Sequence, residues 1–267
     1  MHIVPIFIEF FFAFLLLLWL IPSFVYDKIW QSFLIYKTRK IFKPQWRTFL
    51  IEKVRFYRDL SPHKKKEFEK RLAEFLINYQ IKGVDFPITS LDKVLVAASG
   101  IIPVFAFPTW YYKDLKIIYL FPDAFTFKHP LIPEGTKVNG LVGYGRMKDK
   151  MYLSLKALTE SFEKDQDQQN TGIHEFLHLI DMEDEQADGI PEILMQQTYI
   201  KPWRELIKKE IERVCQDDSI LNDYACQNAA EFFAESGVAF FENPKILQEK
   251  HPELYQMLVR IFMQKPS

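Results

Sequence analysis

Hydrophobic residues are most concentrated near the N-terminus, where residues 3–26 read IVPIFIEFFFAFLLLLWLIPSFVY. Glu9 is the one charged side chain in this stretch. A helix needs roughly 20 apolar residues to cross a bilayer, and a helix that is apolar on every face is rare outside membranes. The pattern predicts a transmembrane helix in residues 1–27, and a buried helix of a soluble fold is the alternative.

Basic side chains follow this stretch but do not precede it. Residues 28–43 carry Lys28, Lys37, Arg39, Lys40 and Lys43. Lys and Arg in such flanks are retained on the cytoplasmic side of a membrane. We therefore expect a single-pass protein of the inner (cytoplasmic) membrane, with its N-terminus outside. Residues 28–43 would then form a basic juxtamembrane segment, and the rest of the chain would lie in the cytoplasm.

From residue 44 onward, apolar positions recur at the spacings of helices and short strands. Helices are expected at residues 47–59, 62–79, 91–102, 202–214, 228–241 and 252–263, and another is expected to begin after Asn170 or Thr171. Strands are expected at residues 117–121, 138–144 and 151–155. The predicted fold of residues 44–267 is one α+β domain, mostly helical with a small mixed sheet.

Composition argues against nucleic acid as a partner and bears on the cellular compartment. The formal net charge of the 267 residues is −1, so the sequence lacks the basic excess that is typical of nucleic-acid-binding proteins. The two cysteines, Cys215 and Cys226, form neither a CxxC pair nor a disulfide framework, which favours a reducing compartment.

The most informative motif is His174-Glu175-Phe176-Leu177-His178. Residues four apart share one face of a helix, so both imidazoles can bind one ion while Glu175 faces a water on that ion. This HExxH arrangement is typical of zinc hydrolases, in which the glutamate acts as general base. The alternative is an ordinary amphipathic helix. The predicted strand at residues 151–155 shortly precedes the motif, and we expect its edge to bind an extended peptide.

A catalytic zinc site usually has three protein ligands. Asp occupies positions 181 and 184, so the chain lacks the third histidine of a metzincin. Glu231 and Glu235 lie four apart on an otherwise apolar helix, where a carboxylate is costly unless it is paired or binds metal. Either one is a candidate ligand, and salt bridges to Lys or Arg are the alternative.

These motifs together resemble the MtfA (Mlc titration factor A) family of peptidases over roughly residues 44–241. The resemblance is carried by HEFLHLIDMED, by the Asp188-Gly189-Ile190-Pro191 that follows, and by residues 224–234. Residues 224–235 are also similar to the metal-ligand helix of anthrax lethal factor.

The resemblance implies a zincin-like metallopeptidase domain that uses Zn²⁺. It implies that Glu231 is the third ligand, that Glu235 is a nearby carboxylate behind the ligands, and that Tyr224 hydrogen-bonds the substrate carbonyl or the leaving group.

The expected function is peptide-bond hydrolysis of a peptide or protein substrate, with His174, His178 and Glu231 on zinc and Glu175 as the base. Asp181, three residues past His178, is expected either to orient a ligand imidazole or to form a salt bridge. Two alternatives remain. One is a regulatory protein on a zincin scaffold that binds a transcriptional regulator and has weak peptidase activity. The other is a membrane-anchored structural protein in which HExxH is accidental.

Overall fold

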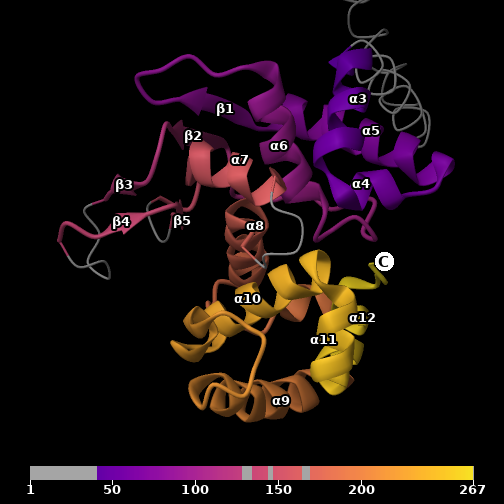
Figure 1. The fold of residues 1–267 in the computed structure, drawn as a ribbon, viewed down its shortest axis with the longest axis vertical. Coiled ribbons are helices and arrows are strands. Elements are labelled where there is room, and N and C mark those ends of the chain that lie inside the picture. Colours follow the sequence, from indigo (N-terminus) through magenta and orange to yellow (C-terminus); the bar gives the residue numbers. More distant parts are fainter. Residues whose placement is uncertain (1–40, 128–133, 144–146, 164–168, 267) are drawn as a thin grey trace, which may run out of the picture. The chain divides into compact units, whose positions relative to one another are not determined.

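The computed structural model describes residues 41–127, 134–143, 147–163 and 169–266 (Figure 1). Lys43–Ser267 forms one compact unit. Across the described residues, no helix has both the length and the apolar character to cross a membrane. The predicted transmembrane helix, residues 1–27, lies outside these residues, as does most of the basic segment 28–43.

Three helices open the described part of the chain: α3 (Pro44–Lys53), α4 (Arg55–Asp59) and α5 (Pro62–Asn78). The single helix expected at residues 47–59 is divided in two, because the buried Val54 has extended backbone angles. Ser61 caps α5, and a proline follows it at the first helical position, as the pattern predicts. Arg47 donates two hydrogen bonds to Glu69, at 2.8 and 2.7 Å, and so joins α3 to α5.

A four-stranded mixed sheet follows, in the order β1 (Gln80–Gly83), β2 (Ile117–Phe121), β6 (Lys150–Ser154) and β5 (Gly140–Val142). The first three strands are parallel, and β5 is antiparallel to β6. A separate two-stranded sheet pairs β3 (Phe125–Thr126) with β4 (Lys137–Val138). The prediction that residues 151–155 offer a free edge is wrong. Residues 151–153 pair with β2 on one side and with β5 on the other, so β5 is the edge strand on this side of the sheet.

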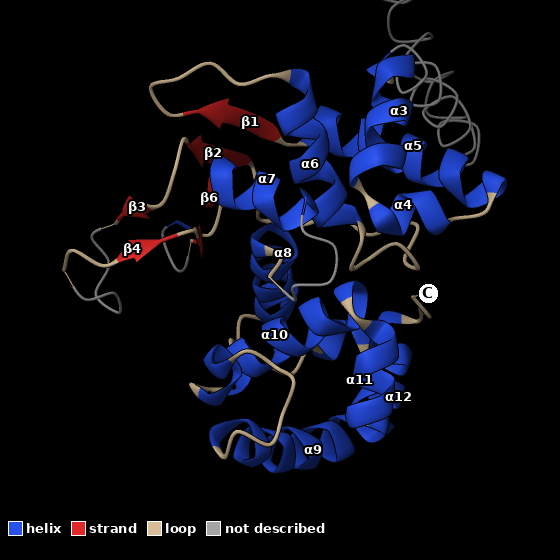
Figure 2. Ribbon diagram, viewed as in Figure 1, coloured by secondary structure: helices blue, strands red, loops and turns tan. Residues whose placement is uncertain are grey.

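Helix α8 (Thr171–Asp181) lies in the middle of this unit, between the part that holds the sheet and the C-terminal helices (Figures 1 and 2). The Asn170 side chain accepts the Ile173 N–H at 3.0 Å and caps the helix, as one of the two candidate caps. Its apolar face is fully buried, with 0% exposure at Ile173, Phe176, Leu177 and Ile180. Burial of each such side chain contributes about 1.5–3 kcal/mol to the free energy of folding.

Helices surround α8 on several sides. Before it come α6 (Ser90–Ile101), close to the expected 91–102, and α7 (Leu155–Glu163), which was not predicted because no Gly or Pro separates it from β6. After it come α9 (Gln197–Cys215), α10 (Ala229–Glu242), α11 (Pro244–Lys250) and α12 (Pro252–Phe262). The mostly helical α+β architecture with a small mixed sheet is thus confirmed.

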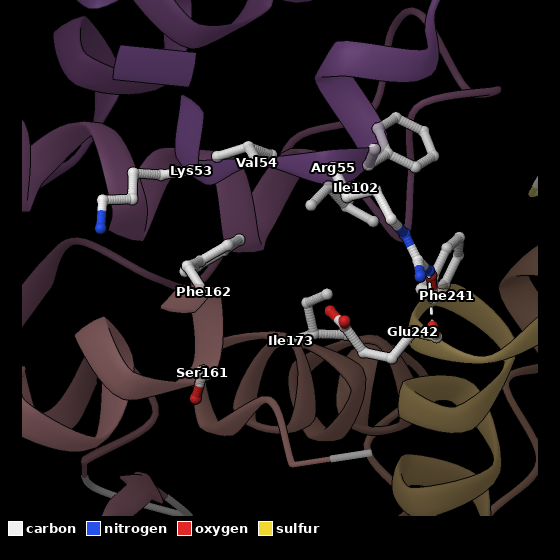
Figure 3. Close-up of a pocket in the computed structure, with 10 residues that line it drawn as sticks. Lys53, Val54, Arg55, Ile102, Ser161, Phe162, Ile173, Phe241 and Glu242 are labelled. Carbon is white, nitrogen blue, oxygen red and sulfur yellow. Dashed lines mark hydrogen bonds between the residues drawn. The ribbon is translucent and has the colours of Figure 1, made fainter. Parts of the chain in front are cut away.

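Helix α10 packs directly against α8. Gly237 makes this close approach possible, since a Cβ there would lie 2.6 Å from Leu177 Cδ1. At the C-terminal end of α10, the carbonyls of Phe241 and Glu242 accept hydrogen bonds from Arg55. These residues line a small pocket (Figure 3). The Glu242 carboxylate also accepts from the side-chain amide of Asn170 at 3.0 Å. The start of α8 is therefore fixed against the end of α10.

The two cysteines differ from the expectation that their spacing gives no disulfide framework. Cys215 and Cys226 form a disulfide, with their Cα atoms 5.3 Å apart. A spacing of 11 residues matches no short motif, but the loop after α9 folds back and brings the two cysteines together.

Candidate metal centre

Three side chains from two helices converge at the contact between α8 and α10. His174 Nε2 and His178 Nε2 are 3.0 Å apart. Glu231 Oε2 lies 3.3 Å from His174 Nε2, and Glu231 Oε1 lies 3.5 Å from His178 Nε2. Within the described part of the chain, this is the one group of three or more His, Cys, Asp or Glu side chains arranged to hold a metal ion. The structure brings together the three predicted ligands.

The spacing of these donor atoms fits a zinc ion. Zn–N and Zn–O bonds of about 2.0–2.1 Å in a tetrahedron place neighbouring ligand atoms about 3.3 Å apart. The three observed separations lie within a few tenths of an ångström of that value. In addition, Glu231 Oε2 is buried without a hydrogen bond of good geometry. A buried carboxylate oxygen in that position is satisfied by a cation.

Local sequence explains how Glu231 reaches the histidines. Asn228 caps α10 by accepting the Glu231 N–H at 2.9 Å, which fixes where the helix starts. Glu231 therefore lies in the first turn of α10, where the helix dipole favours a negative charge. Although burial raises the pKa of Glu231, its ion-pair contacts with His174 and His178 hold that pKa well below the usual range.

Glu235 lies behind the ligands, one turn along α10 from Glu231. Its Oε1 is 3.2 Å from His174 Nδ1, the ring nitrogen that points away from the three converging atoms. A carboxylate in this position fixes the tautomer and orientation of a ligand imidazole. Burial lowers the pKa of His174, but its ion-pair contacts with Glu231 and Glu235 outweigh burial and raise the pKa to about 10. The cluster therefore favours a positive charge at its centre.

Glu175 projects toward the edge strand. Its side chain is 7% exposed and packs against the backbone of Gly140 in β5, where a Cβ would lie 2.3 Å from Glu175 Oε1. Burial raises the pKa of this carboxyl, and the two neighbouring histidines lower it. A carboxyl whose pKa is raised in this way is suited to accept and return a proton.

The expectation for Asp181 is corrected. Asp181 is fully buried, and its Oδ2 accepts the Gly189 N–H at 3.0 Å; no hydrogen bond joins it to a histidine or a cationic side chain in the described residues. Trp203 donates to the Gly189 carbonyl at 2.8 Å, and Gly189 has φ +75 and packs against Ala229. Asp181 therefore fixes the turn at Gly189, which lies in the connection between α8 and α9. This turn packs against the start of α10.

Tyr224 lies in the short 3-10 helix η4 (Asp223–Cys226), which packs against α9 and α10. Its side chain is 54% exposed, and its backbone N–H donates to the Asn222 side chain. The structure thus places Tyr224 on the segment that leads directly into the helix of Glu231.

A pocket opens beside the C-terminal half of α8. Met182, one turn past His178, lines it together with Leu179, Leu115 and the ring of Tyr112. Gly143, which directly follows β5, closes another side. Charged side chains complete the lining: Asp114, Lys148, Glu183 and Glu185. The lining of the pocket therefore combines apolar and charged side chains.

Gly140 and this pocket were not anticipated. The glycine stands inside an apolar strand pattern, which is a known sign of close backbone approach, so a signal for Gly140 was present. The pocket had no such signal, because its lining comes from three separate parts of the chain.

Comparisons with known proteins agree with this geometry. Residues 28–263 match the family model for glucose-regulated metallo-peptidase M90. An uncharacterized protein of Synechocystis sp. is 28% identical over 234 residues, which cover 84% of this chain and 85% of that protein. Mlc titration factor A of Pectobacterium atrosepticum is 29% identical over 103 residues, or 36% of this chain and 39% of that protein. Mlc titration factor A of Yersinia pestis is 31% identical over 105 residues, or 36% and 38%.

Proposed function

The chain belongs to the glucose-regulated metallo-peptidase M90 family, and from that premise we propose that it is a zinc-dependent peptidase. Relatives named Mlc titration factor A support the same family resemblance that the motifs indicate. The further similarity to anthrax lethal factor stays a prediction.

One observation carries the proposal: His174, His178 and Glu231 present three donor atoms within 4.8 Å of one another, at tetrahedral zinc spacing. A structural salt bridge would need one carboxylate and one cation. Here two imidazole nitrogens face each other at 3.0 Å, and a shared ion satisfies both.

The side chains around this centre have distinct tasks. Zinc held by these ligands supplies a Lewis acid that lowers the pKa of a water toward 7 and polarises a carbonyl. Glu175 takes the proton from the attacking water and later gives it to the leaving amine. Glu235 holds the His174 imidazole in its binding tautomer. Tyr224 donates a hydrogen bond to the oxyanion that develops on the scissile carbonyl.

The substrate is a peptide bound in extended form along β5. This strand is the sheet edge, it packs against α8, and its Gly140 contacts Glu175. An edge strand offers unpaired N–H and C=O groups to which a peptide can add as a further strand. The pocket lined by Met182 and Leu179 would then receive one side chain of that peptide.

We also propose that residues 1–27 anchor the protein in the inner (cytoplasmic) membrane, with the peptidase domain in the cytoplasm. The apolar run at residues 3–26, in which Glu9 is the one charged residue, supports this placement, and so do the basic residues that follow it. Fractionation of cells that express the full chain, followed by protease treatment of spheroplasts, checks both the anchor and its orientation.

The decisive experiment is Glu175→Gln in the full chain. Zinc content, measured by mass spectrometry, should stay at one ion per chain, while cleavage of a peptide library falls by 10²–10⁴-fold. Glu205→Gln is the matched control, because Glu205 is exposed on α9 and should leave turnover unchanged. Full turnover in Glu175→Gln would remove the proposed base.

The name of the Mlc titration factor A relatives favours a second candidate function, a regulatory protein that binds a transcriptional regulator. A binding scaffold does not require a base. Binding that survives Glu175→Gln, in a protein whose wild type cleaves no peptide in the library, would favour this alternative.

A further inference from the structure

A disulfide closes the loop between α9 and α10. Cys215 is the last residue of α9, and Cys226 is the last residue of η4. Cys215 is exposed and Cys226 is partly exposed, so a thiol in solution can reach the bond. These are the two cysteines of the whole chain, so thiol chemistry on this protein reports on this bond alone.

The segment that the disulfide fixes carries Tyr224. The helix η4 is a single turn, held internally by Ala225 N–H to Asn222 O at 2.9 Å and Gln227 N–H to Tyr224 O at 3.0 Å. The Tyr224 ring is more than half exposed, so few contacts of its own hold it. Its position depends on where the η4 backbone lies, and the disulfide is the covalent link between that backbone and α9.

The rest of the loop has its own attachments. Arg213 binds Asp218 at 3.1 Å, Ser219 Oγ lies 3.2 Å from His251 Nε2, and the Leu221 side chain is 5% exposed. None of these contacts involves a cysteine. Breaking the disulfide therefore removes the covalent link between η4 and α9 while residues 218–221 stay in place, and η4 is then held by its packing against α9 and α10 through the buried Ala225.

We propose that the Cys215–Cys226 disulfide positions Tyr224 at the metal centre, so that the redox state of this pair controls turnover. This inference rests on the proposed peptidase function and on the role of Tyr224 in it. A dithiol reductant supplies two electrons and two protons. The S–S bond breaks, two S–H groups form, and the reductant becomes a disulfide. The reduced protein keeps its metal ligands but holds Tyr224 loosely.

The effect has a defined kinetic form. Tyr224 acts on charge that develops only in the transition state, so loss of its position lowers kcat and leaves KM and zinc content nearly unchanged. The loss is bounded by that of Tyr224→Phe, roughly 10²–10³-fold for one oxyanion donor. When Tyr224 is already Phe, opening the disulfide should have no further effect.

The experiment compares four full-chain proteins: wild type, Cys215→Ser/Cys226→Ser, Tyr224→Phe, and the triple variant. Serine replacement opens the cross-link without a thiol reagent that would also bind zinc. We expect kcat to fall at least tenfold in Cys215→Ser/Cys226→Ser with KM within twofold, and to be equal in Tyr224→Phe and the triple variant. Dithiol treatment, compared at equal zinc content in all four proteins, should lower kcat of wild type only. A further loss in the triple variant beyond Tyr224→Phe would overturn the proposal.

Amide hydrogen exchange supplies a readout that does not depend on activity. Exchange at residues 222–227 should rise at least tenfold on reduction, while exchange at residues 171–181 stays the same. Unchanged exchange at residues 222–227 would overturn the positioning role. A wild type that cleaves nothing refutes the proposed peptidase function instead, and the exchange measurement still decides whether the disulfide holds η4.

Discussion

Substitution of Gly140 by alanine tests the arrangement of the base. In β5, a Cβ at this position would lie 2.3 Å from Glu175 Oε1, 2.5 Å from Cγ and 2.6 Å from Cδ. Ordinary contacts begin at 3.4 Å. The added methyl group therefore meets the stem of Glu175 as well as its end, and rotation of the carboxylate alone does not relieve the overlap.

The size of the effect follows from these distances. Glu175 must retreat by about 1 Å, and a misplacement of that size costs about 10²-fold in rate, or about 2.7 kcal/mol of transition-state stabilisation. The proposed zinc ligands are on α8 and α10, and the three heavy atoms nearest to a Cβ at position 140 all belong to Glu175, so metal binding should persist. We expect Gly140→Ala to lower kcat by about 10²-fold at full zinc content.

The assay measures kcat on a peptide substrate, zinc by mass spectrometry and thermal unfolding by circular dichroism. Gly135→Ala is the matched control. An alanine methyl group at position 135 meets nothing within 4 Å, but the φ of +84 strains an alanine there. This variant therefore shows what a loss of stability does to turnover when no side chain is displaced. Turnover of Gly140→Ala within threefold of wild type would mean that the short strand β5 moves instead of Glu175, and the reasoning would fail.

Other predictions concern the ligands and one buried acid. Glu231→Ala should lose most bound zinc, while Glu235→Ala should lose less; the reverse order in metal analysis would exchange their roles. Burial raises the pKa of Asp181 from 3.8 to about 7, so the folded protein holds a proton that the unfolded chain releases. The stability of wild type should therefore fall as pH rises from about 4 to 7, by at most about 4 kcal/mol, and Asp181→Asn should lack this component. Urea unfolding of wild type and Asp181→Asn at pH 5 and pH 8 measures this difference in stability. An equal change of unfolding free energy with pH in both proteins would contradict the raised pKa of Asp181.

Local patterns identified much of the centre. The helical spacing of His174 and His178 places both imidazoles on one face whatever surrounds the helix. The apolar face of α8 and its cap at Asn170 are likewise readable from neighbouring residues. The choice between Glu231 and Glu235 was not readable in this way, because both lie on the same helix face. The start of α10 at Asn228 and the angle at which it crosses α8 decide which carboxylate meets the Nε2 atoms.

Long-range contacts explain the predictions that were wrong. The strand next to the metal helix looked like an edge strand, but strand order depends on which segments pair across the whole sheet, and β5 covers β6. Asp181 looked like a partner of a ligand imidazole, but the turn at Gly189 returns to meet it. The disulfide was missed for the same reason, since the path of the loop after α9 is set by Arg213 and by His251, which lies between α11 and α12.

The sequence by itself determined the helical pattern, the HExxH face and the candidate acids, because these depend on periodicity and on residue type within a few positions. Tertiary structure alone decided which acid joins the histidines, which strand is the edge, and that the two cysteines meet. Those outcomes depend on how helices and strands far apart in the chain pack to bury their apolar faces, and local sequence does not encode the resulting distances.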